Sequence, residues 1–385
     1  MPDGAGSLTL SLHRSIHAIG AADWDGCAGA DNPFVSFAFL SALEDSGSAS
    51  AKTGWLPQHL CLRDADGRIV AVAPAYAKAH SYGEYVFDHG WADALERAGG
   101  RYYPKLQVAV PFSPVPGPRL LVRPGSGIPL AALAQALVQA CEALGCSSVH
   151  ATFCRAEEWE ALGEAGWLQR IGQQFHWTNE GYGSFEDFLS ALRASRRKTI
   201  RRERRAAADG LTLRTLRGAD ITPAHWNAFY AFYRSTTDRK WGDAYLRRGF
   251  FPLLGERLGA RCVLMLAESR GAPVAGALNL IGGDTLYGRN WGATIDRAFL
   301  HFELCYYQAI EFAIRHGLRR VEAGAQGEHK IQRGYLPVPT FSAHWIAHGG
   351  LRAAVADYLT RERPAVEAEM ADLATLSPFH RADEA

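Results

Sequence analysis

The sequence predicts an α/β fold of the α+β kind, built from two similar mixed-sheet halves in one chain of 385 residues. Three observations support this fold class. Six segments recur in the same order in both halves, short runs of β-type residues are bounded by turn residues, and helix-length apolar segments end at glycines. A chain of this length is typical of two or three domains.

The composition is that of an ordinary globular protein without a global electrostatic field. Apolar residues make up 48% and charged residues 21%, and the formal net charge is +1, so attraction to nucleic acid or membrane requires a local patch. No run approaches the roughly 18 apolar residues of a membrane span, and the first residues lack the pattern of a secretory signal. The seven scattered cysteines have no metal-type spacing, so we expect a cytoplasmic protein without a metal.

The repeat begins with the first strand of each half. Residues 8–24 (LTLSLHRSIHAIGAADW) resemble residues 211–226 (LTLRTLRGADITPAHW), and each predicts a strand, a loop and a helix start. Residues 61–76 (CLRDADGRIVAVAPAY) resemble residues 265–280 (MLAESRGAPVAGALNL), and both predict hairpins that turn at Gly67 and Gly271. Residues 85–91 (YVFDHGW) and 286–292 (LYGRNWG) predict a further strand that ends in aromatic side chains.

The second part of the repeat is a helix followed by two strands. Residues 129–145 and 301–317 predict helices that end at Gly145 and Gly317. Strands follow at residues 147–154 (SSVHATFC) and 319–326 (RRVEAGAQ), and then at residues 173–179 (QQFHWTN) and 341–347 (FSAHWIA), whose shared His-Trp pairs we expect in the core. The alternative, two unrelated α/β domains, does not account for six matches in one order.

Two segments lie outside the repeat. Residues 92–127, rich in Pro and Gly but including LQVAVPF, predict an ordered surface insertion whose prolines keep its strand at a sheet edge or in a loop. Residues 184–210 predict a basic helix capped by Ser184 and ended by Gly210. We therefore predict two similar domains at residues 1–183 and 211–385 with the basic helix between them, and a last helix that Pro364 interrupts.

The order strand, helices, hairpin, long strand, helix, strand and final hairpin resembles the topology of GNAT acyltransferases. Two copies in one chain resemble the Fem family of peptidoglycan aminoacyltransferases, and in particular the FemAB-like N-acyltransferases. The likeness covers nearly the whole chain and is carried by residues 86–119, 185–213 and 322–335, the last of which reads EAGAQGEHKIQRGY. The resemblance implies two tandem GNAT-like domains and transfer of an acyl or aminoacyl group to an amine.

The phosphate loop of acetyl-CoA-using GNAT enzymes is altered in this chain. That loop offers glycine N–H groups at a helix N-terminus, whereas residues 292–302 (GATIDRAFLHF) lack its glycine pattern. Residues 123–129 (RPGSGIP) come closer. The candidate ligands for donor phosphates are therefore Arg119, Arg123, Gly125 and Gly127, together with Arg196, Arg197 and Arg201 of the basic helix. A charge run of this kind is also typical of a solvated helix face.

Acyl transfer to an amine needs a base, a donor to the oxyanion and a source of a proton. Four residues are the predicted catalytic set: Glu322 at a strand end as base, His329 as proton relay, Lys330 as a counter-charge and Tyr335 as acid. The predicted substrate-binding residues are Gln326, Glu328 and Arg333 in the same loop, Arg289, Asn290 and Trp291 after the long strand, and Asp88, His89, Tyr103 and Lys105 in the first half. The plainer alternatives are a capped surface loop, an aromatic plug and a packed insertion.

Two classes of function fit these features. The first is an N-acyltransferase whose donor is acyl-CoA or aminoacyl-tRNA, whose acceptor is a small-molecule or peptide amine, and which holds no tightly bound cofactor. The second is a non-catalytic GNAT-like ligand-binding protein. The polar residues from Glu322 onward favour the enzyme, and the altered phosphate loop favours the binding protein.

Overall fold

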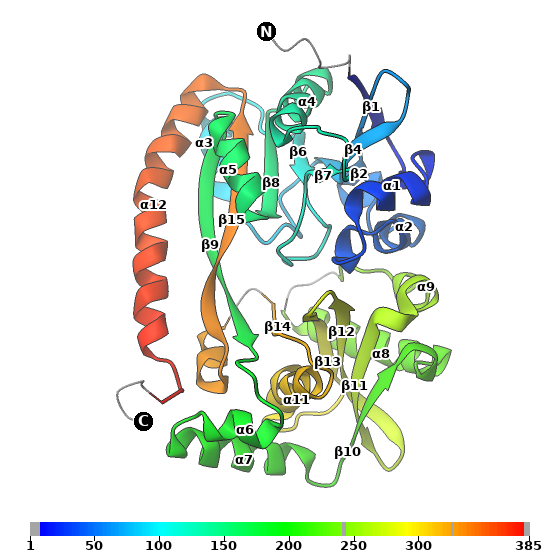
Figure 1. Cartoon of the computed structure of the whole chain (residues 1–385), viewed down its shortest axis with the longest axis vertical. Coiled ribbons are helices and arrows are strands. Elements are labelled where there is room, and N and C mark those ends of the chain that lie inside the picture. Colours follow the sequence, from blue (N-terminus) through cyan, green and yellow to red (C-terminus); the bar gives the residue numbers. More distant parts are fainter. Residues whose placement is uncertain (1–7, 241–243, 325–326, 381–385) are drawn as a thin grey trace. The chain divides into compact units, whose positions relative to one another are not determined.

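The computed structural model describes residues 8–240, 244–324 and 327–380 (Figure 1). Its contacts divide the chain into unit 1, Met1–Gly172 with Pro339–Val366, and unit 2, Gln173–Val338 with Glu367–Ala385. The chain passes from unit 1 to unit 2 within β9 (Leu168–Thr178) and returns within β15 (Leu336–Ile346). Each unit therefore uses a strand from the other half of the sequence.

Unit 1 is built on short strands that pair mainly antiparallel. One sheet has the order β1-β3-β4-β7, and the other contains the run β15-β8-β6-β5-β2, in which β6 and β8 are parallel. The strands are β1 (Thr9–His13), β2 (Trp55–Pro57), β3 (His59–Arg63), β4 (Ile69–Ala73), β5 (Ala75–Lys78), β6 (Lys105–Val108), β7 (Leu121–Val122) and β8 (Ser148–Cys154).

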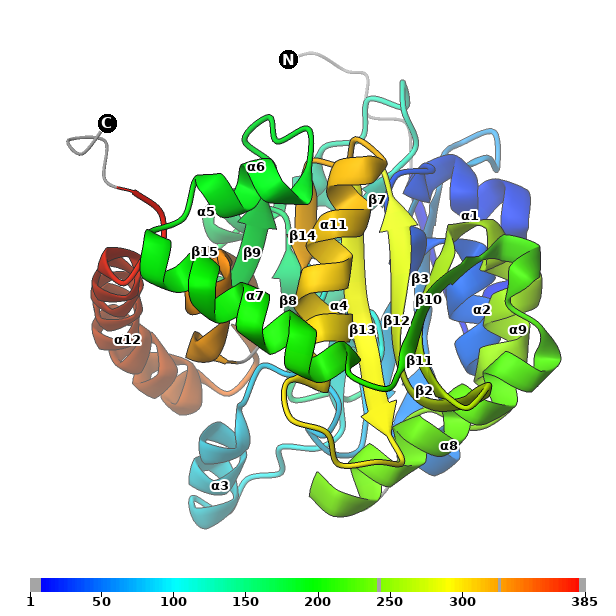
Figure 2. The same cartoon turned by 90° about the horizontal axis from the view of Figure 1, so that it is seen from below.

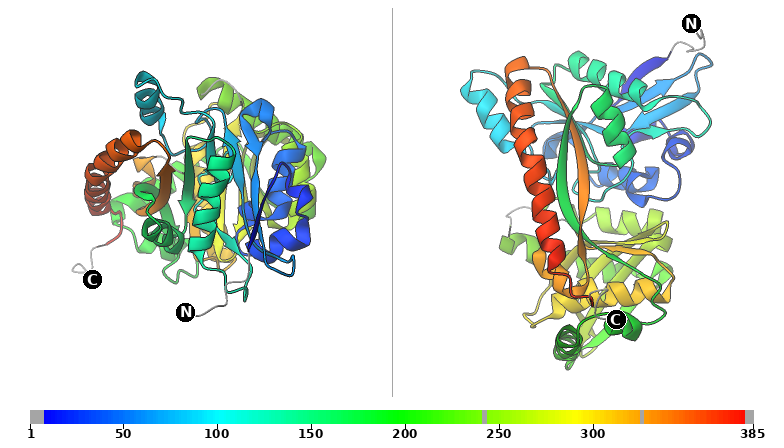
Figure 3. Two further views of the ribbon diagram at one scale, coloured as in Figure 1. Left: turned by 90° about the horizontal axis from the view of Figure 1, so that it is seen from above. Right: turned by 60° about the vertical axis from the view of Figure 1, so that its left-hand side comes forward.

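Helices cover the sheet of unit 1, with α4 packed against β8 and β3 (Figure 3). Its apolar side chains, among them Leu133 and Leu137, fill a core with Leu106 and Val149. A second apolar cluster joins Trp91 of α3 to the first part of α12. The helices are α1 (Ala21–Ala28), α2 (Phe37–Asp45), α3 (His89–Arg97), α4 (Leu130–Ala143), α5 (Ala156–Glu164) and α12 (Gly349–Thr375), which continues into unit 2.

Unit 2 has a regular mixed sheet in the order β10-β11-β12-β13-β14-β9. The four strands from β10 to β13 are antiparallel, β13 and β14 are parallel, and β9 is antiparallel to β14. The strands are β10 (Thr212–Arg217), β11 (Cys262–Ser269), β12 (Ala272–Gly282), β13 (Thr285–Ala293) and β14 (Arg320–Glu322).

Helices lie on both faces of the sheet of unit 2 (Figure 2). On one face α11 packs against β13 and β14, whereas α8 packs against β12 and β13. The helices are α6 (Phe185–Ser190), α7 (Ala194–Ala208), α8 (Pro223–Lys240), α9 (Phe250–Leu258), α10 (Leu300–Phe302), the π-helix η6 (Glu303–Tyr307) and α11 (Gln308–Arg315). The short 3-10 helices of the chain are η1 (Ile16–Ala18), η2 (Pro33–Val35), η3 (Ala51–Thr53), η4 (Gly218–Asp220), η5 (Gly259–Arg261) and η7 (Glu328–Arg333). Among the described helices, none has the length and apolar character needed to cross a membrane.

The strand pairings of the two units match, and the last strand is exchanged. Both units contain an antiparallel hairpin flanked by the first strand (β1-β3-β4 and β10-β11-β12), and both contain a parallel pair (β6-β8 and β13-β14). The sequence match of β8 with β14 places His150 opposite His344 in unit 1 and Glu322 opposite His176 in unit 2. The last strand of each sheet therefore comes from the other half of the sequence: β15 lies in the sheet of unit 1, and β9 lies in the sheet of unit 2.

Two predictions about unit 1 are wrong. Residues 85–91 do not form a strand: they run from a loop, in which Tyr85 has a φ of 61°, into the start of α3. The counterpart of β13 is instead β6, which was predicted to lie in a surface insertion at a sheet edge. β6 is central and fully buried between β5 and β8, because Pro104 and Pro111 lie outside the four residues that pair.

Two helix predictions also need correction. The basic segment is not one helix, because α6 ends at Ser190 and α7 begins at Ala194 after Arg193 adopts an extended backbone. The last helix is not interrupted at Pro364, and α12 continues through it to Thr375. Ser184 caps α6 as predicted, its side chain accepting a hydrogen bond from the backbone N–H of Asp187 at 3.1 Å.

Candidate functional site

A small pocket of about 80 Å³ opens in unit 2 beside the second half of β13. It brings together the predicted residues Arg289, Asn290 and Trp291 with residues from β12, β14 and the helical segment after β13. The full lining is Ala277, Leu278, Asn279, Gly288, Arg289, Asn290, Trp291, His301, Cys305, Tyr306 and Ala323.

The pocket forms where β13 separates from its neighbours. β13 pairs with β14 only over Thr285–Tyr287, because β14 ends at Glu322. On the other side the register between β12 and β13 shifts at Leu278/Asn279, a β-bulge that leaves Arg289 without an opposite residue. Bulges are frequent next to active sites, where they redirect a side chain. The strand end and the bulge therefore create an opening at the position where the sequence predicts a substrate site.

A turn of π-helix forms the facing wall. Cys305 and Tyr306 of η6 line the pocket, as does His301 of α10. π-Helical turns are frequently found at functional sites. These three residues were not predicted, because HFELCYY reads as about two turns of an amphipathic helix and periodicity cannot distinguish a π-turn from an α-turn. The unusual density of aromatic and histidine residues was the available signal.

Glu322 is a buried carboxyl group next to the pocket: its neighbour Ala323 lines the pocket, and Glu322 itself does not. It ends the central strand β14, and its side chain is 5% exposed, so burial raises its pKa to about 8 against the influence of Arg320 and Arg289. Oε1 lies 3.9 Å from Nδ1 of His176, and Oε2 accepts no hydrogen bond from the described part of the chain. Burial lowers the pKa of His176 to about 3, so this histidine is neutral.

The loop after β14 brings the other three predicted catalytic residues to η6. Lys330 is buried, its Nζ donates to the carbonyl of Gly324 at 2.8 Å, and burial lowers its pKa to about 8. Nε2 of His329 lies 3.0 Å from the hydroxyl of Tyr306. Tyr335 is fully buried, and its hydroxyl donates to the carbonyl of Tyr306 at 3.4 Å. Tyr306 thus connects His329 and Tyr335 to the pocket wall.

Arg333 and Glu328 of the same loop are not among the residues that line the pocket. Arg333 donates to Glu203 of α7 at 2.9 Å and stacks on Phe302 with its guanidinium carbon 3.5 Å from the ring centre. Glu328 is exposed at the start of η7. Gln326 lies outside the described residues.

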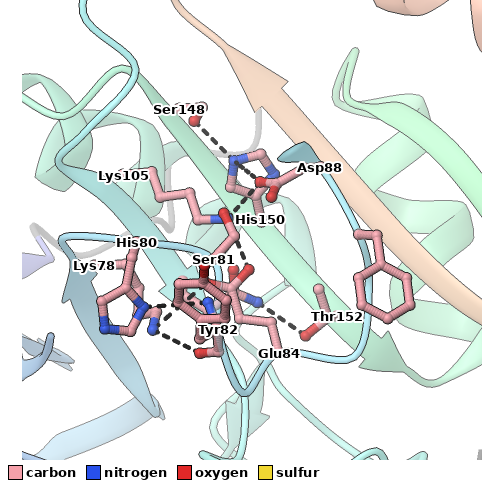
Figure 4. Close-up of polar contacts among 12 residues, drawn as sticks. Lys78, His80, Ser81, Tyr82, Glu84, Asp88, Lys105, Ser148, His150 and Thr152 are labelled. Carbon is pink, nitrogen blue, oxygen red and sulfur yellow. Dashed lines mark hydrogen bonds and ion pairs between the residues drawn. The ribbon is translucent and has the colours of Figure 1, made fainter. Parts of the chain in front are cut away.

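In unit 1, two predicted residues meet in a buried ionic cluster (Figure 4). The ammonium group of Lys105 forms an ion pair with Asp88, lies 2.7 Å from Oε2 of Glu84 and donates to Oγ of Ser81 at 2.8 Å. Asp88 also accepts from the hydroxyl of Tyr102 at 2.7 Å. Burial would raise the pKa of Asp88, but Lys105 and then His150 hold it well below its usual range.

The other two predicted residues of unit 1 lie at the edge of this cluster. The hydroxyl of Tyr103 is 2.9 Å from Oγ of Ser81, and the ring of His89 stacks on Phe87. Asp88 and His89 do not lie on the strand predicted for residues 85–91, because Asp88 is the N-cap residue of α3 and His89 is its first residue.

In unit 1, the two arginines predicted to bind donor phosphates make hydrogen bonds to neighbouring parts of the fold. Arg119 is buried, and its guanidinium donates to three backbone carbonyls, including that of Thr152 at 2.9 Å. A phosphate would have to displace these contacts, so the assignment of Arg119 needs correction. Arg123 donates to the carbonyl of Ile69 at 2.6 Å and to Asp23 at 2.9 Å. Gly125 and Gly127 have positive φ angles in the turn before α4.

The arginines of α7 differ in their surroundings. Arg197 donates to the carbonyls of Ser190 and Leu192 at 3.1 Å each, which ties α7 to the end of α6. Arg201 forms an ion pair with Glu186, and both side chains are exposed. Arg196 is half-buried. α7 as a whole packs against η6, whose residues line the pocket.

Solved structures with a similar fold include FemX and a domain of a synthetase. FemX is 11% identical with a TM-score of 0.54, covering 87% of this chain and 98% of that chain. The C-terminal domain of a proposed lysylphosphatidylglycerol synthetase from Agrobacterium fabrum is 10% identical with a TM-score of 0.53, covering 88% and 94%. A protein of unknown function from Bacteroides thetaiotaomicron is 12% identical with a TM-score of 0.50, covering 87% and 99%. Such identities show the fold, and the predicted fold class, an α/β chain with two mixed-sheet units, is confirmed.

The family of the chain is shown by a family model that matches its sequence. The FemAB-like model, described as peptidoglycan biosynthesis/recognition, matches residues 15–381, so the chain belongs to the FemAB-like family. No curated protein matches the chain. The resemblance drawn from the repeated segments is thereby confirmed.

Proposed function

We propose that the chain is an N-acyltransferase whose catalytic site is the pocket of unit 2 together with Glu322 at the adjoining end of β14. The observation that carries this proposal is the buried carboxyl group of Glu322 at the point where the bulged strand β13 parts from β14. Membership of the FemAB-like family and the fold shared with FemX support a transferase, and the family's description supports a substrate connected with peptidoglycan.

The acceptor amine must lose a proton before it can attack. Glu322 is our candidate base, because a pKa of about 8 allows it to exchange protons near neutral pH. Its Oε2 is the buried oxygen without a hydrogen-bond donor among the described residues, so it is the oxygen available to an ammonium group. His176, neutral and 3.9 Å from the other oxygen, would take part in passing the proton on.

Negative charge then develops on the carbonyl oxygen of the donor. Arg289 is the candidate to stabilise it, because it lines the pocket before the donor arrives. Tyr306 is the candidate acid for the leaving group, since burial raises its pKa and keeps its hydroxyl protonated. Tyr335, the residue predicted for this role, contacts the backbone of Tyr306 and would position it.

The experiment supplies radiolabelled aminoacyl-tRNA or acetyl-CoA to the purified protein with a panel of peptide and small-molecule amines. We expect amide formation from one donor class, and a loss in kcat on the order of 10² to 10⁴ in the Glu322→Gln variant, as is usual for removal of a positioned base. Glu256→Gln, an exposed carboxylate on α9, is the matched control. Full turnover by Glu322→Gln, or transfer from neither donor, would contradict the proposal.

A further inference from the structure

The π-helical turn η6 is held at both of its ends by the neighbouring helix α7. Glu303, the first residue of the turn, forms an ion pair with Arg204, whose Nη2 lies 3.0 Å from Oε1 and whose Nε lies 3.1 Å from Oε2. Tyr307, the last residue of the turn, donates a hydrogen bond from its hydroxyl to Glu203. Two adjacent residues of α7 therefore contact the two ends of a single turn.

The carboxylates of this arrangement are buried, so each depends on its cation. Glu303 and Glu203 are 1% and 6% exposed. A buried carboxylate is costly unless a cation and hydrogen-bond donors satisfy it. Arg204 supplies both for Glu303, and Arg333 does so for Glu203, with Nη2 2.9 Å from Oε2. Neither carboxylate can lose its partner without leaving a buried charge unpaired.

A π-turn needs such support, because it is a rare alternative to the α-helix that the same residues could form. In η6 the backbone N–H of Gln308 bonds to the carbonyl of Glu303, five residues earlier instead of the usual four. If the turn relaxed to an α-helix, the residues before it would rotate by about 100° relative to α11, the angle between successive residues of a helix. The side chains of Cys305 and Tyr306 would then be redirected from the pocket that they line.

The same network reaches the loop after β14. Arg333, the partner of Glu203, also donates to the carbonyl of His329 at 2.7 Å. Nε2 of His329 in turn lies 3.0 Å from the hydroxyl of Tyr306. The hydroxyl of Tyr306 is thus fixed from two sides, by the turn that carries it and by a loop that Glu203 holds through Arg333.

We propose that Glu203 and Arg204 are positioning residues, which keep η6 in its π-helical form and so hold the hydroxyl of Tyr306 at the pocket. The inference rests on the proposed function, in which Tyr306 is the acid for the leaving group. It adds a role for two residues that lie outside the lining of the pocket. Arg204 thereby differs from Arg202 and Arg205 of the same helix, which are exposed.

The test uses the full-length protein and follows the pocket wall through the thiol of Cys305. Six of the seven cysteines are buried, whereas Cys305 is partly exposed and lines the pocket. Its alkylation by iodoacetamide is measured by mass spectrometry of the peptide that contains it. Tyr307→Phe and Glu303→Gln each release one end of the turn at nearly constant volume. Each should raise the alkylation rate about tenfold, since a hydrogen bond to a charged group is lost.

A matched control tests whether any lost tyrosine hydroxyl has this effect. The hydroxyl of Tyr358 in α12 donates to Glu362 at 2.7 Å, as that of Tyr307 donates to Glu203. Tyr358→Phe should leave the alkylation of Cys305 unchanged. Melting temperatures show which variants are folded. Tyr307→Phe removes only a hydroxyl group and keeps the pair of Glu203 with Arg333, so it decides the test if Glu303→Gln does not fold.

Catalysis is the second readout, because a role in packing alone would not separate kcat from KM. Both variants should lower kcat roughly 10- to 100-fold, the effect of a misplaced catalytic group. KM should stay within about twofold of the wild-type value, since the acid acts in the chemical step and not in binding. Tyr358→Phe should change neither constant.

Two results would overturn the inference. Unchanged alkylation of Cys305 in the folded variants would show that the π-turn keeps its form without α7. Faster alkylation with an unchanged kcat would show that the turn does not position the acid. If the wild-type protein transfers no acyl group, the proposed function fails by its own test, whereas the alkylation rates still decide whether α7 holds the turn.

Discussion

Glu322 shows how much one buried ionisable residue can affect the protein. Its pKa of about 8 in the folded chain is well above the ordinary value of 4.5 for a glutamate. Between these two values the folded state binds the proton that the unfolded state has released, so stability decreases as the pH rises through this window. Such a cost is tolerated when the group has a function, which is why a perturbed pKa in a pocket indicates a site.

We therefore predict that the stability of the wild-type protein relative to Glu322→Gln falls by a few kcal/mol as the pH rises from about 4.5 to 8. The size follows because each tenfold change in proton affinity between the folded and unfolded states corresponds to about 1.4 kcal/mol. Urea denaturation of both proteins across this range measures the difference. Below the window the two curves should run parallel. A constant difference between pH 4.5 and 8 would show that Glu322 ionises as it does in water.

A second prediction at this scale concerns the pH dependence of catalysis. If Glu322 is the base, kcat/KM should rise with pH and level off above an apparent pKa near 8, because only the ionised carboxylate accepts a proton. Initial rates from about pH 6 to 10 test this. A profile that lacks this rise, or that keeps it in Glu322→Gln, would assign the base to another group such as His329 or Lys330.

At the scale of secondary structure, β13 lies unusually close to the backbone of α8. A Cβ added to Gly292 would be 2.0 Å from the carbonyl oxygen of Phe232, and that oxygen belongs to a backbone that cannot rotate away. We predict that Gly292→Ala destabilises the protein by about 2 kcal/mol or more, the usual cost of overpacking. Gly90→Ala in α3, where the added carbon has open space, is the control and should be neutral or slightly stabilising. Equal melting temperatures for the two variants would contradict the prediction.

The basic helix α7 offers a comparison between two neighbouring arginines. Arg197 ties α7 to the carbonyls at the end of α6, whereas the half-buried Arg196 makes no such contact in the described chain. If the donor is a tRNA, Arg196→Glu should weaken its binding and reduce the salt dependence while stability is retained. Arg197→Glu should lower stability as well. Donor binding that is indifferent to salt and to Arg196→Glu would contradict a phosphate-binding role for α7.

Some parts of the candidate site and of the fold could be predicted from the sequence, and others could not. Glu322 and Arg289 were found because strand ends and long strands can be recognised from apolar periodicity and glycines. The π-helical wall with Cys305 and Tyr306 was not, since it depends on one extra residue in a turn. β6 was predicted at a sheet edge because prolines lie close to it in the sequence. Those prolines lie outside Lys105–Val108, the residues that pair with the neighbouring strands. Burial of Lys78 and Gln107 depends on the loop of residues 79–88, which periodicity does not describe.

For the whole molecule, the exchange of β9 and β15 makes each unit depend on both halves of the sequence. β8 needs β15 as its antiparallel neighbour, and β14 needs β9. We predict that fragments 1–183 and 184–385, produced separately, expose unpaired strand edges and aggregate, whereas the two fragments produced together reconstitute a folded complex. Circular dichroism and gel filtration of the fragments test this. A fragment that is monomeric, soluble and cooperatively folded by itself would contradict the prediction.

The same exchange sets the order in which the protein can be completed during synthesis. The contact between His150 of β8 and His344 of β15 joins residues 194 positions apart. At about 5–20 residues per second, the ribosome needs on the order of ten seconds or more to supply that distance. Throughout this time β8, a strand whose seven residues are all buried in the folded protein, has an open edge, although most of unit 1 has already been translated. A cell that makes this protein must therefore protect an unfinished sheet until almost the last part of the chain emerges, so its yield should depend on chaperones and on translation speed more than its final stability suggests.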